Sequence, residues 1–152
     1  MLLVPSLTIR YGWAVCLALA AISTAQSSVQ TPKPGTALRK AVLDGLRPSV
    51  EKDLKQKVIF KVDAMRVYKG WAFVHVHPIK PNGKPIDFRK TKYAEALEAG
   101  MFDGDSTYAL LKQSGSKWVV KEFAIGPTDV VWSNWMGAPH HPPKQIFPPM
   151  GE

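Results

Sequence analysis

The sequence predicts an α+β domain in which an N-terminal helix packs on a four-stranded antiparallel sheet. Apolar residues recur every three or four positions over residues 36–55, which places them on one face of a helix. Later segments either alternate apolar and polar side chains or are rich in Val, Trp and Phe, as strands are. The element order is helix, two strands, an insertion, two strands and a short helix. Two packed layers would bury both apolar faces.

Residues 1–25 are predicted to be a cleavable secretory signal peptide. Arg10 is their only charge, an apolar run covers residues 11–22, and small residues end at Ala25, after which we expect cleavage. The apolar run is shorter than the ~20 residues that span a bilayer. We therefore expect a secreted or periplasmic protein with no transmembrane span after cleavage. The alternative is an uncleaved membrane anchor.

Composition limits the chemistry of the mature chain. Cys16 is the only cysteine and leaves with the signal, so disulfides and thiol chemistry are excluded and the fold depends on its core. Losing Arg10 leaves 19 Lys and Arg against 12 Asp and Glu, a net charge of +7. The lysines are scattered, which favours a mixed soluble surface, and we expect no nucleic-acid partner.

The N-terminal elements follow from local signals. Residues 26–35 are polar and proline-containing, which indicates a flexible leader. Thr36 is the predicted N-cap of the first helix. Pro48 interrupts the apolar pattern, so it should kink the helix or divide it in two.

The first two strands are expected at residues 58–67 and 71–78. Phe60, Val62 and Ala64 alternate with polar residues, but the alternation then slips by one, which predicts a β-bulge near Ala64. Lys69 and Gly70 form the turn between the two strands, so they pair antiparallel. In the second strand the alternate positions face opposite sides of the sheet; one side carries the residues Trp71, Phe73, His75 and His77.

The insertion and the second pair of strands follow. Residues 79–90 are irregular, and Thr91 is expected to begin a short helix that Gly100 terminates. The third and fourth strands are predicted at residues 107–113 and 117–125. The hairpin loop between them is Ser114-Gly115-Ser116.

The C-terminal region is predicted as a short helix and a tail. Thr128 or Asp129 should cap a helix that runs through Trp135, and Gly137 should close it. These boundaries give one α+β domain over residues 36–137. The tail, residues 138–152, is rich in proline and should run extended over the surface.

Three segments of the chain are distinctive: Gly70-Trp71-Ala72-Phe73-Val74, Tyr108-Ala109-Leu110-Leu111 and Gly126-Pro127-Thr128-Asp129-Val130-Val131-Trp132. Through these segments the chain resembles a family of small secreted bacterial proteins of unknown function. The resemblance implies a fold but no assigned activity. The element order also resembles cystatin-like and NTF2-like folds, in which a helix lies in the grip of a curved antiparallel sheet; this analogy is one of architecture.

Two histidines are the candidate metal ligands. His75 and His77 are two positions apart on one predicted strand, so both side chains point to the same face, and such a pair can chelate a transition metal. His140 and His141 could supply further nitrogens. The alternative is that all four are ordinary surface histidines.

Other candidate residues each have a plainer structural explanation. Asp103, Asp105 and Ser106 have the residue types of a calcium loop but lack the later bidentate Glu, so a turn is favoured. Asp129 could be a catalytic carboxylate but is better explained as a helix cap. Aromatic side chains could line a binding groove or pack in the core; they are Trp71, Phe73, Trp118, Trp132 and Trp135.

The leading functional hypothesis is a non-enzymatic exported protein that binds a cell-envelope component or a partner protein, without a cofactor. The sequence has no Gly-rich phosphate loop, no Gly-x-Ser-x-Gly elbow and no His-Glu-x-x-His motif. Two alternatives remain open. One is a small NTF2-like enzyme with His75, His77 and a carboxylate in a pocket of the curved sheet, and the other is a histidine-based metal-binding protein.

Overall fold

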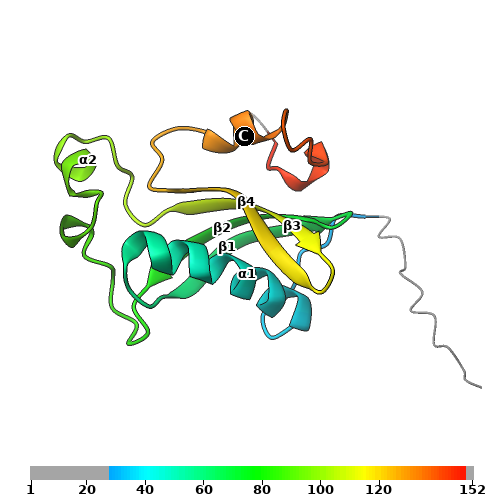
Figure 1. The fold of residues 1–152 in the computed structure, drawn as a ribbon, viewed down its shortest axis with the longest axis horizontal. Coiled ribbons are helices and arrows are strands. Elements are labelled where there is room, and N and C mark those ends of the chain that lie inside the picture. Colours follow the sequence, from blue (N-terminus) through cyan, green and yellow to red (C-terminus); the bar gives the residue numbers. More distant parts are fainter. Residues whose placement is uncertain (1–27, 150–152) are drawn as a thin grey trace, which may run out of the picture.

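The computed structural model describes residues 28–149 and has three layers (Figure 1). A long helix covers one face of a four-stranded antiparallel sheet, and the C-terminal segment covers part of the other face. The predicted α+β class, with a helix on a four-stranded antiparallel sheet and a further short helix, is confirmed. The predicted signal peptide, residues 1–25, lies outside the described residues.

The helix α1 (Ala37–Leu54) begins at the predicted cap. The Thr36 hydroxyl accepts a hydrogen bond from the Arg39 amide, which satisfies one free N–H of the first turn. Pro48 lies inside the helix and does not divide it. The buried side of the helix consists of Val42, Leu46, Val50 and Leu54.

The four strands pair in chain order. They are β1 (Ile59–Tyr68), β2 (Trp71–Ile79), β3 (Thr107–Ser114) and β4 (Lys117–Ile125). On the face toward α1, strand residues pack against the helix in a core that includes Ala72, Val74, Val76, Ala109, Leu111 and Trp118. We call the opposite face the outer face of the sheet.

Turn chemistry sets the register of the first hairpin. Lys69 and Gly70 have φ values of 48° and 72°, as a two-residue hairpin turn of type I′ requires. Tyr68 therefore pairs with Trp71, and the pairing continues back along β1 from that point.

A β-bulge interrupts this hairpin at Asp63. Val62 pairs with Val76 and Ala64 pairs with His75, so Asp63 has no partner across the ladder. The predicted bulge near Ala64 is confirmed. The alternation had placed Ala64 on the same side as Val62, whereas the extra residue puts it opposite His75 on the outer face.

The insertion between β2 and β3 contains two short helices. The 3-10 helix η1 (Phe88–Lys90) was not predicted, and α2 (Ala94–Glu98) was. The Thr91 hydroxyl accepts a hydrogen bond from the Tyr93 amide at the start of α2. Gly100, at φ 67°, lets the chain leave the helix as expected.

An ion pair and a tyrosine hydrogen bond tie the insertion to the helix layer. The Asp53 carboxylate on α1 accepts hydrogen bonds from the Tyr93 hydroxyl and the Lys92 ammonium group. The side chain of Asp53 is only 14% exposed. The insertion is therefore held against α1, and the loop that leads into β3 starts from a fixed position.

The predicted short C-terminal helix is present as the 3-10 helix η2 (Val131–Trp135). Neither Thr128 nor Asp129 caps it: the preceding residue is Val130, and no side chain caps the helix. The backbone closes the turn instead, because the Ser133 amide donates to the Val130 carbonyl at 3.0 Å. The prediction rested on capping residue types placed just before a short helix. A 3-10 turn that is closed by a backbone hydrogen bond needs no side-chain cap.

The C-terminal tail is packed and is not a surface strap. After η3 (Lys144–Ile146), Ile146 is fully buried and Phe147 is 3% exposed. They pack in a second core with four other buried residues, Trp71, Phe73, Leu110 and Trp135. The prolines predicted an extended exposed tail, but the apolar outer face of the sheet needs a cover and these residues supply it. We call residues 131–147 the C-terminal cap.

The leader also differs from the sequence prediction. Gln30 forms a bridge to Val67 through hydrogen bonds in both directions, 2.8 and 2.9 Å long, and Pro32 is buried. Gln30 and Pro32 of the predicted leader are thus packed against the domain. Among the described helices, none has the length and apolar character needed to span a bilayer.

Candidate functional site

Polar side chains converge on the outer face of the sheet beyond the edge of the C-terminal cap. His75 and His77 point away from α1, because they alternate along β2 with the core residues Val74 and Val76. Their ring centroids are 5.1 Å apart. The side chains are 22% and 25% exposed, so solvent reaches both imidazoles.

His77 is held between two carboxylates. Its Nε2 lies 2.8 Å from Asp63 Oδ2, and its Nδ1 lies 2.9 Å from Asp105 Oδ1. An ionised carboxylate can only accept a hydrogen bond, so both ring N–H groups donate and the imidazole carries a proton on each nitrogen. Two carboxyl groups thus flank one imidazole, an arrangement that favours the protonated form of His77.

His75 has a different environment. Its ring stacks on Tyr108, with centroids 4.3 Å apart and an interplanar angle of 13°. A hydrogen bond of 2.8 Å joins its Nε2 to Ser106 Oγ, and its Nδ1 lies 3.8 Å from Asp63 Oδ2. The stack and the hydrogen bond together fix the orientation of this ring. We call His75, His77, Asp63, Asp105 and Ser106 the histidine face.

Two irregular backbone features bring the carboxylates to the histidines. The bulge at Asp63 directs an extra side chain of β1 toward the two rings. The loop before β3 supplies Asp105 and Ser106, and a backbone hydrogen bond of 2.7 Å from the Gly126 amide to the Ser106 carbonyl holds that loop. Bulges and loop ends recur at functional sites because they can place side chains that a regular ladder cannot.

The electrostatic surroundings shift the pKa values of the two histidines in opposite directions. Burial alone would lower the pKa of His77, but hydrogen bonds to Asp105 and Asp63 outweigh it and raise that pKa. Burial lowers the pKa of His75, and the Asp63 carboxylate offsets this only in part. The hydrogen bond from His77 holds the pKa of Asp63 below its ordinary value. The histidine face therefore places an imidazole with a raised pKa beside one with a lowered pKa, next to a carboxyl group whose pKa is also lowered.

An NMR titration of the metal-free protein should resolve this difference. We expect His77 to titrate above the ordinary value of 6.5 and His75 below it. Because the folded-state pKa of His77 is the raised one, its stabilising contribution is fully present below pH 6.5 and disappears as the pH rises through that pKa. The Asp63→Asn variant should lower the pKa of His77. Two histidines that titrate together, or a His75 that titrates above 6.5, would contradict the geometry.

The structure accounts differently for the aromatic residues that the sequence singled out. Trp71, Phe73 and Trp135 are buried in the second core, and Trp118 is buried beneath α1, so all four pack the interior. Trp132 is half-buried and packs on Tyr108 with ring centroids 4.5 Å apart. Of the predicted aromatic residues, Trp132 is thus the one beside the histidine face.

The other candidate residues fall into two groups. His140 lies away from the histidine face, where its Nε2 contacts Glu122 Oε1 on β4 at 2.9 Å. Asp105 lies in a turn as predicted, and Ser106 directly follows it. Their side chains contact His77 and His75, which the sequence did not indicate. The sequence analysis did not identify Asp63 as a candidate site residue.

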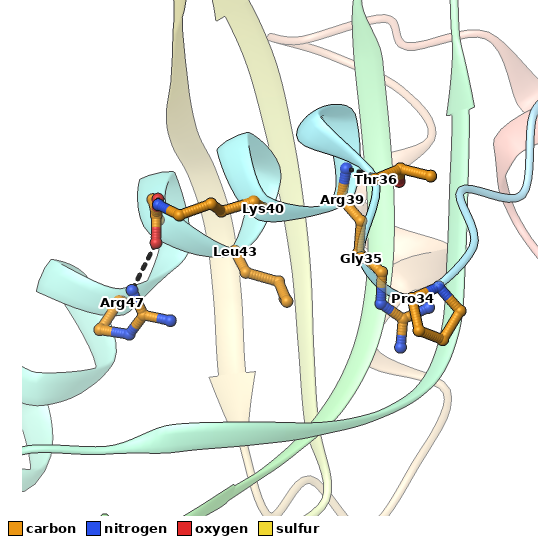
Figure 2. Close-up of a pocket in the computed structure, with 8 residues that line it drawn as sticks. Pro34, Gly35, Thr36, Arg39, Lys40, Leu43 and Arg47 are labelled. Atoms are coloured by element: carbon orange, nitrogen blue, oxygen red, sulfur yellow. Dashed lines mark hydrogen bonds and ion pairs between the residues drawn. The ribbon is translucent and has the colours of Figure 1, made fainter.

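A pocket along α1 is a second surface of interest (Figure 2). It has a volume of about 320 Å³, and its lining includes Arg39, Lys40, Leu43 and Arg47. Asp44 pairs with both Lys40 and Arg47, so charges of opposite sign alternate along this side of the helix. Such a pattern is typical of a solvated helix surface. The histidine face is the more specific site.

Comparisons with known proteins add no functional assignment: no protein-family model, no curated protein and no solved structure matches this chain.

Proposed function

We propose that this chain is an exported, non-enzymatic binding protein that takes its ligand at the histidine face. The observation that supports this most directly is the convergence of polar side chains from β1, β2 and the loop before β3 on a solvent-accessible part of the outer face. The C-terminal cap packs on another part of that face. We also retain as proposals the secreted or periplasmic location, the kinship with small secreted bacterial proteins, and a cystatin-like or NTF2-like arrangement.

The placement of the histidines favours binding over the enzyme alternative. An NTF2-like enzyme would need His75 and His77 at a pocket between the helix and the curved sheet. They lie on the face away from α1, while the side toward α1 is filled by fully buried residues such as Leu46 and Val74.

Nucleophilic hydrolysis is a second candidate because Ser106 Oγ lies 2.8 Å from His75 Nε2. A neutral imidazole in this position can accept a hydroxyl proton. The third contact of a Ser-His-Asp arrangement is too long, since Asp63 Oδ2 is 3.8 Å from His75 Nδ1 and is engaged by His77. Hydrolysis of a chromogenic ester that Ser106→Ala abolishes would replace the binding proposal with this candidate.

Surface mapping by NMR tests the binding proposal. Isotopically labelled protein is mixed with solubilised envelope extract, with and without EDTA. We expect shifts at His75, His77 and the Trp132 indole, and none along the α1 pocket at Leu43. Perturbation centred on α1, or none at any concentration of extract, would contradict the proposal.

The proposed secreted or periplasmic location has a separate test. We expect the chain in the secreted or periplasmic fraction of the cells, with Gln26 as its first residue.

A further inference from the structure

The histidine face offers three donor atoms in an arrangement that suits a metal ion. One ring nitrogen of His75, one of His77 and one carboxylate oxygen of Asp63 all lie within 4.8 Å of one another. The Asp63 oxygen is 2.8 Å from His77 Nε2 and 3.8 Å from His75 Nδ1. In a tetrahedral site with bonds of ~2.0–2.1 Å, ligand atoms are about 3.3 Å apart. Small side-chain rotations would therefore bring the three atoms to bonding distance.

The nitrogens that the metal would take are His75 Nδ1 and His77 Nε2, the two on the side of Asp63, because the other nitrogen of each ring contacts a residue outside the ligand set. His77 Nδ1 contacts the Asp105 carboxylate at 2.9 Å, and His75 Nε2 contacts Ser106 Oγ at 2.8 Å. Metal-binding histidines almost always donate their second N–H to such a partner, which fixes the tautomer and the direction of the ring. Asp105 and Ser106 are thus positioning residues for the two imidazoles.

The ring orientations are fixed before any ligand arrives. Tyr108 stacks on His75, and Trp132 packs in turn on Tyr108, so the cap supports the ring from behind. His75 and His77 come from one strand and Asp63 from the strand paired with it, and the hairpin fixes their separation. A preorganised site loses less conformational entropy when it binds.

We propose that the ligand of the histidine face is a divalent transition-metal ion of the Zn²⁺ and Cu²⁺ class, bound by Asp63, His75 and His77. This inference rests on the proposed function and names its ligand. The ion replaces the proton shared by His77 and Asp63. Two imidazole nitrogens select such ions over Ca²⁺ and Mg²⁺, which prefer oxygen ligands. Three protein ligands leave a coordination position for water or for a donor group from a partner.

Calorimetric titration of the chain recovered after export, with no histidine tag, tests the proposal. We expect one Zn²⁺ per chain, bound with micromolar affinity or better, and no comparable binding of Mg²⁺ or Ca²⁺. His77→Gln and Asp63→Asn should each weaken Zn²⁺ binding by more than about 100-fold, and Asp105→Asn by about 10-fold, as expected for the loss of a supporting carboxylate. The matched control is His140→Gln, because His140 also contacts a carboxylate but lies elsewhere.

A second measurement keeps the test independent of how the variants fold. In the NMR spectrum of the unmodified chain, Zn²⁺ should shift the ring resonances of His75 and His77 and leave those of His140 in place. The proposal is overturned by unmoved His75 and His77 signals in excess Zn²⁺, by equal weakening in His140→Gln, or by Mg²⁺ binding of equal strength. The NMR experiment with envelope extract, repeated with EDTA, distinguishes the binding proposal from the metal proposal. Shifts at the histidine face that persist in EDTA support binding there even if Zn²⁺ does not bind.

Discussion

Replacing Gly45 with alanine should destabilise the protein by about 2–3 kcal/mol, which reverses the effect that helix propensity predicts. In an exposed helix interior, alanine is more favourable than glycine by about 1 kcal/mol. At Gly45 the added methyl group would lie 2.4 Å from the Trp118 carbonyl oxygen and 2.8 Å from its Cβ. Trp118 lies on β4, which is paired to β3, so its backbone cannot move away alone. The helix and the sheet must separate.

The comparison that isolates this contact is Gly137→Ala. Gly137 has ordinary φ and no atom within 4 Å of where a Cβ would be placed. Its replacement should be neutral or slightly stabilising, because alanine restricts the unfolded chain. Urea unfolding followed by circular dichroism gives both free energies of unfolding. A Gly45→Ala variant as stable as Gly137→Ala would mean that α1 and β4 are not in such close contact.

Truncating Phe147 to alanine should cost about 3–5 kcal/mol, the range for removing a buried phenylalanine. Phe147 is 3% exposed, and its ring centroid lies 5.4 Å from that of Phe73. The substitution opens a cavity beside the sheet and weakens the attachment of the cap. A loss of this size is a large fraction of the free energy of unfolding of a typical domain, which is about 5–15 kcal/mol.

Val130→Ala is the matched control for this second core. Val130 precedes the cap but is 47% exposed, so its truncation should change the free energy of unfolding by less than about 0.5 kcal/mol. Chemical denaturation of both variants makes the comparison. If residues 138–152 were the exposed tail that their prolines suggest, Phe147→Ala would be as mild as Val130→Ala. The cap as described requires the two values to differ.

Local signals in the sequence were sufficient for most of the fold. Thr36, the Lys69-Gly70 turn and Gly100 each have a preference that the surrounding chain does not override, so the elements begin and end near the predicted positions. The slip in alternation located the bulge for the same reason. Of the two outcomes predicted for Pro48, division of the helix does not occur, because a long amphipathic face packed on a sheet can retain a proline inside the helix.

The cover on the outer face could not be predicted by periodicity. Ile146 and Phe147 lie among prolines and have no helical or strand pattern, so nothing local indicates that they are buried. Their burial follows from the apolar side chains that the sheet presents there, such as Phe73 and Leu110. That requirement becomes visible only when the whole sheet is assembled.

The candidate site was predictable in part. The alternation along β2 placed His75 and His77 on one face. Counting back from the two-residue turn in a regular ladder would have paired Asp63 with Val76, which faces the core, so Asp63 comes beside the histidines only through the bulge. No comparable count reaches Asp105 and Ser106, because residues 80–106 separate β2 from β3 and fix no register. Their contacts with the histidines depend on tertiary packing of that insertion.

Because Asp63 lies in the bulge, its carboxylate can be removed without changing how β1 and β2 pair. Asp63 is the one residue of β1 that has no paired residue on β2. Deleting it would therefore leave Val62 paired with Val76 and Ala64 paired with His75, as before. A one-codon deletion could thus erase the acid and regularise the hairpin at the same time. In this architecture the sheet and the chemistry it displays can change independently of each other.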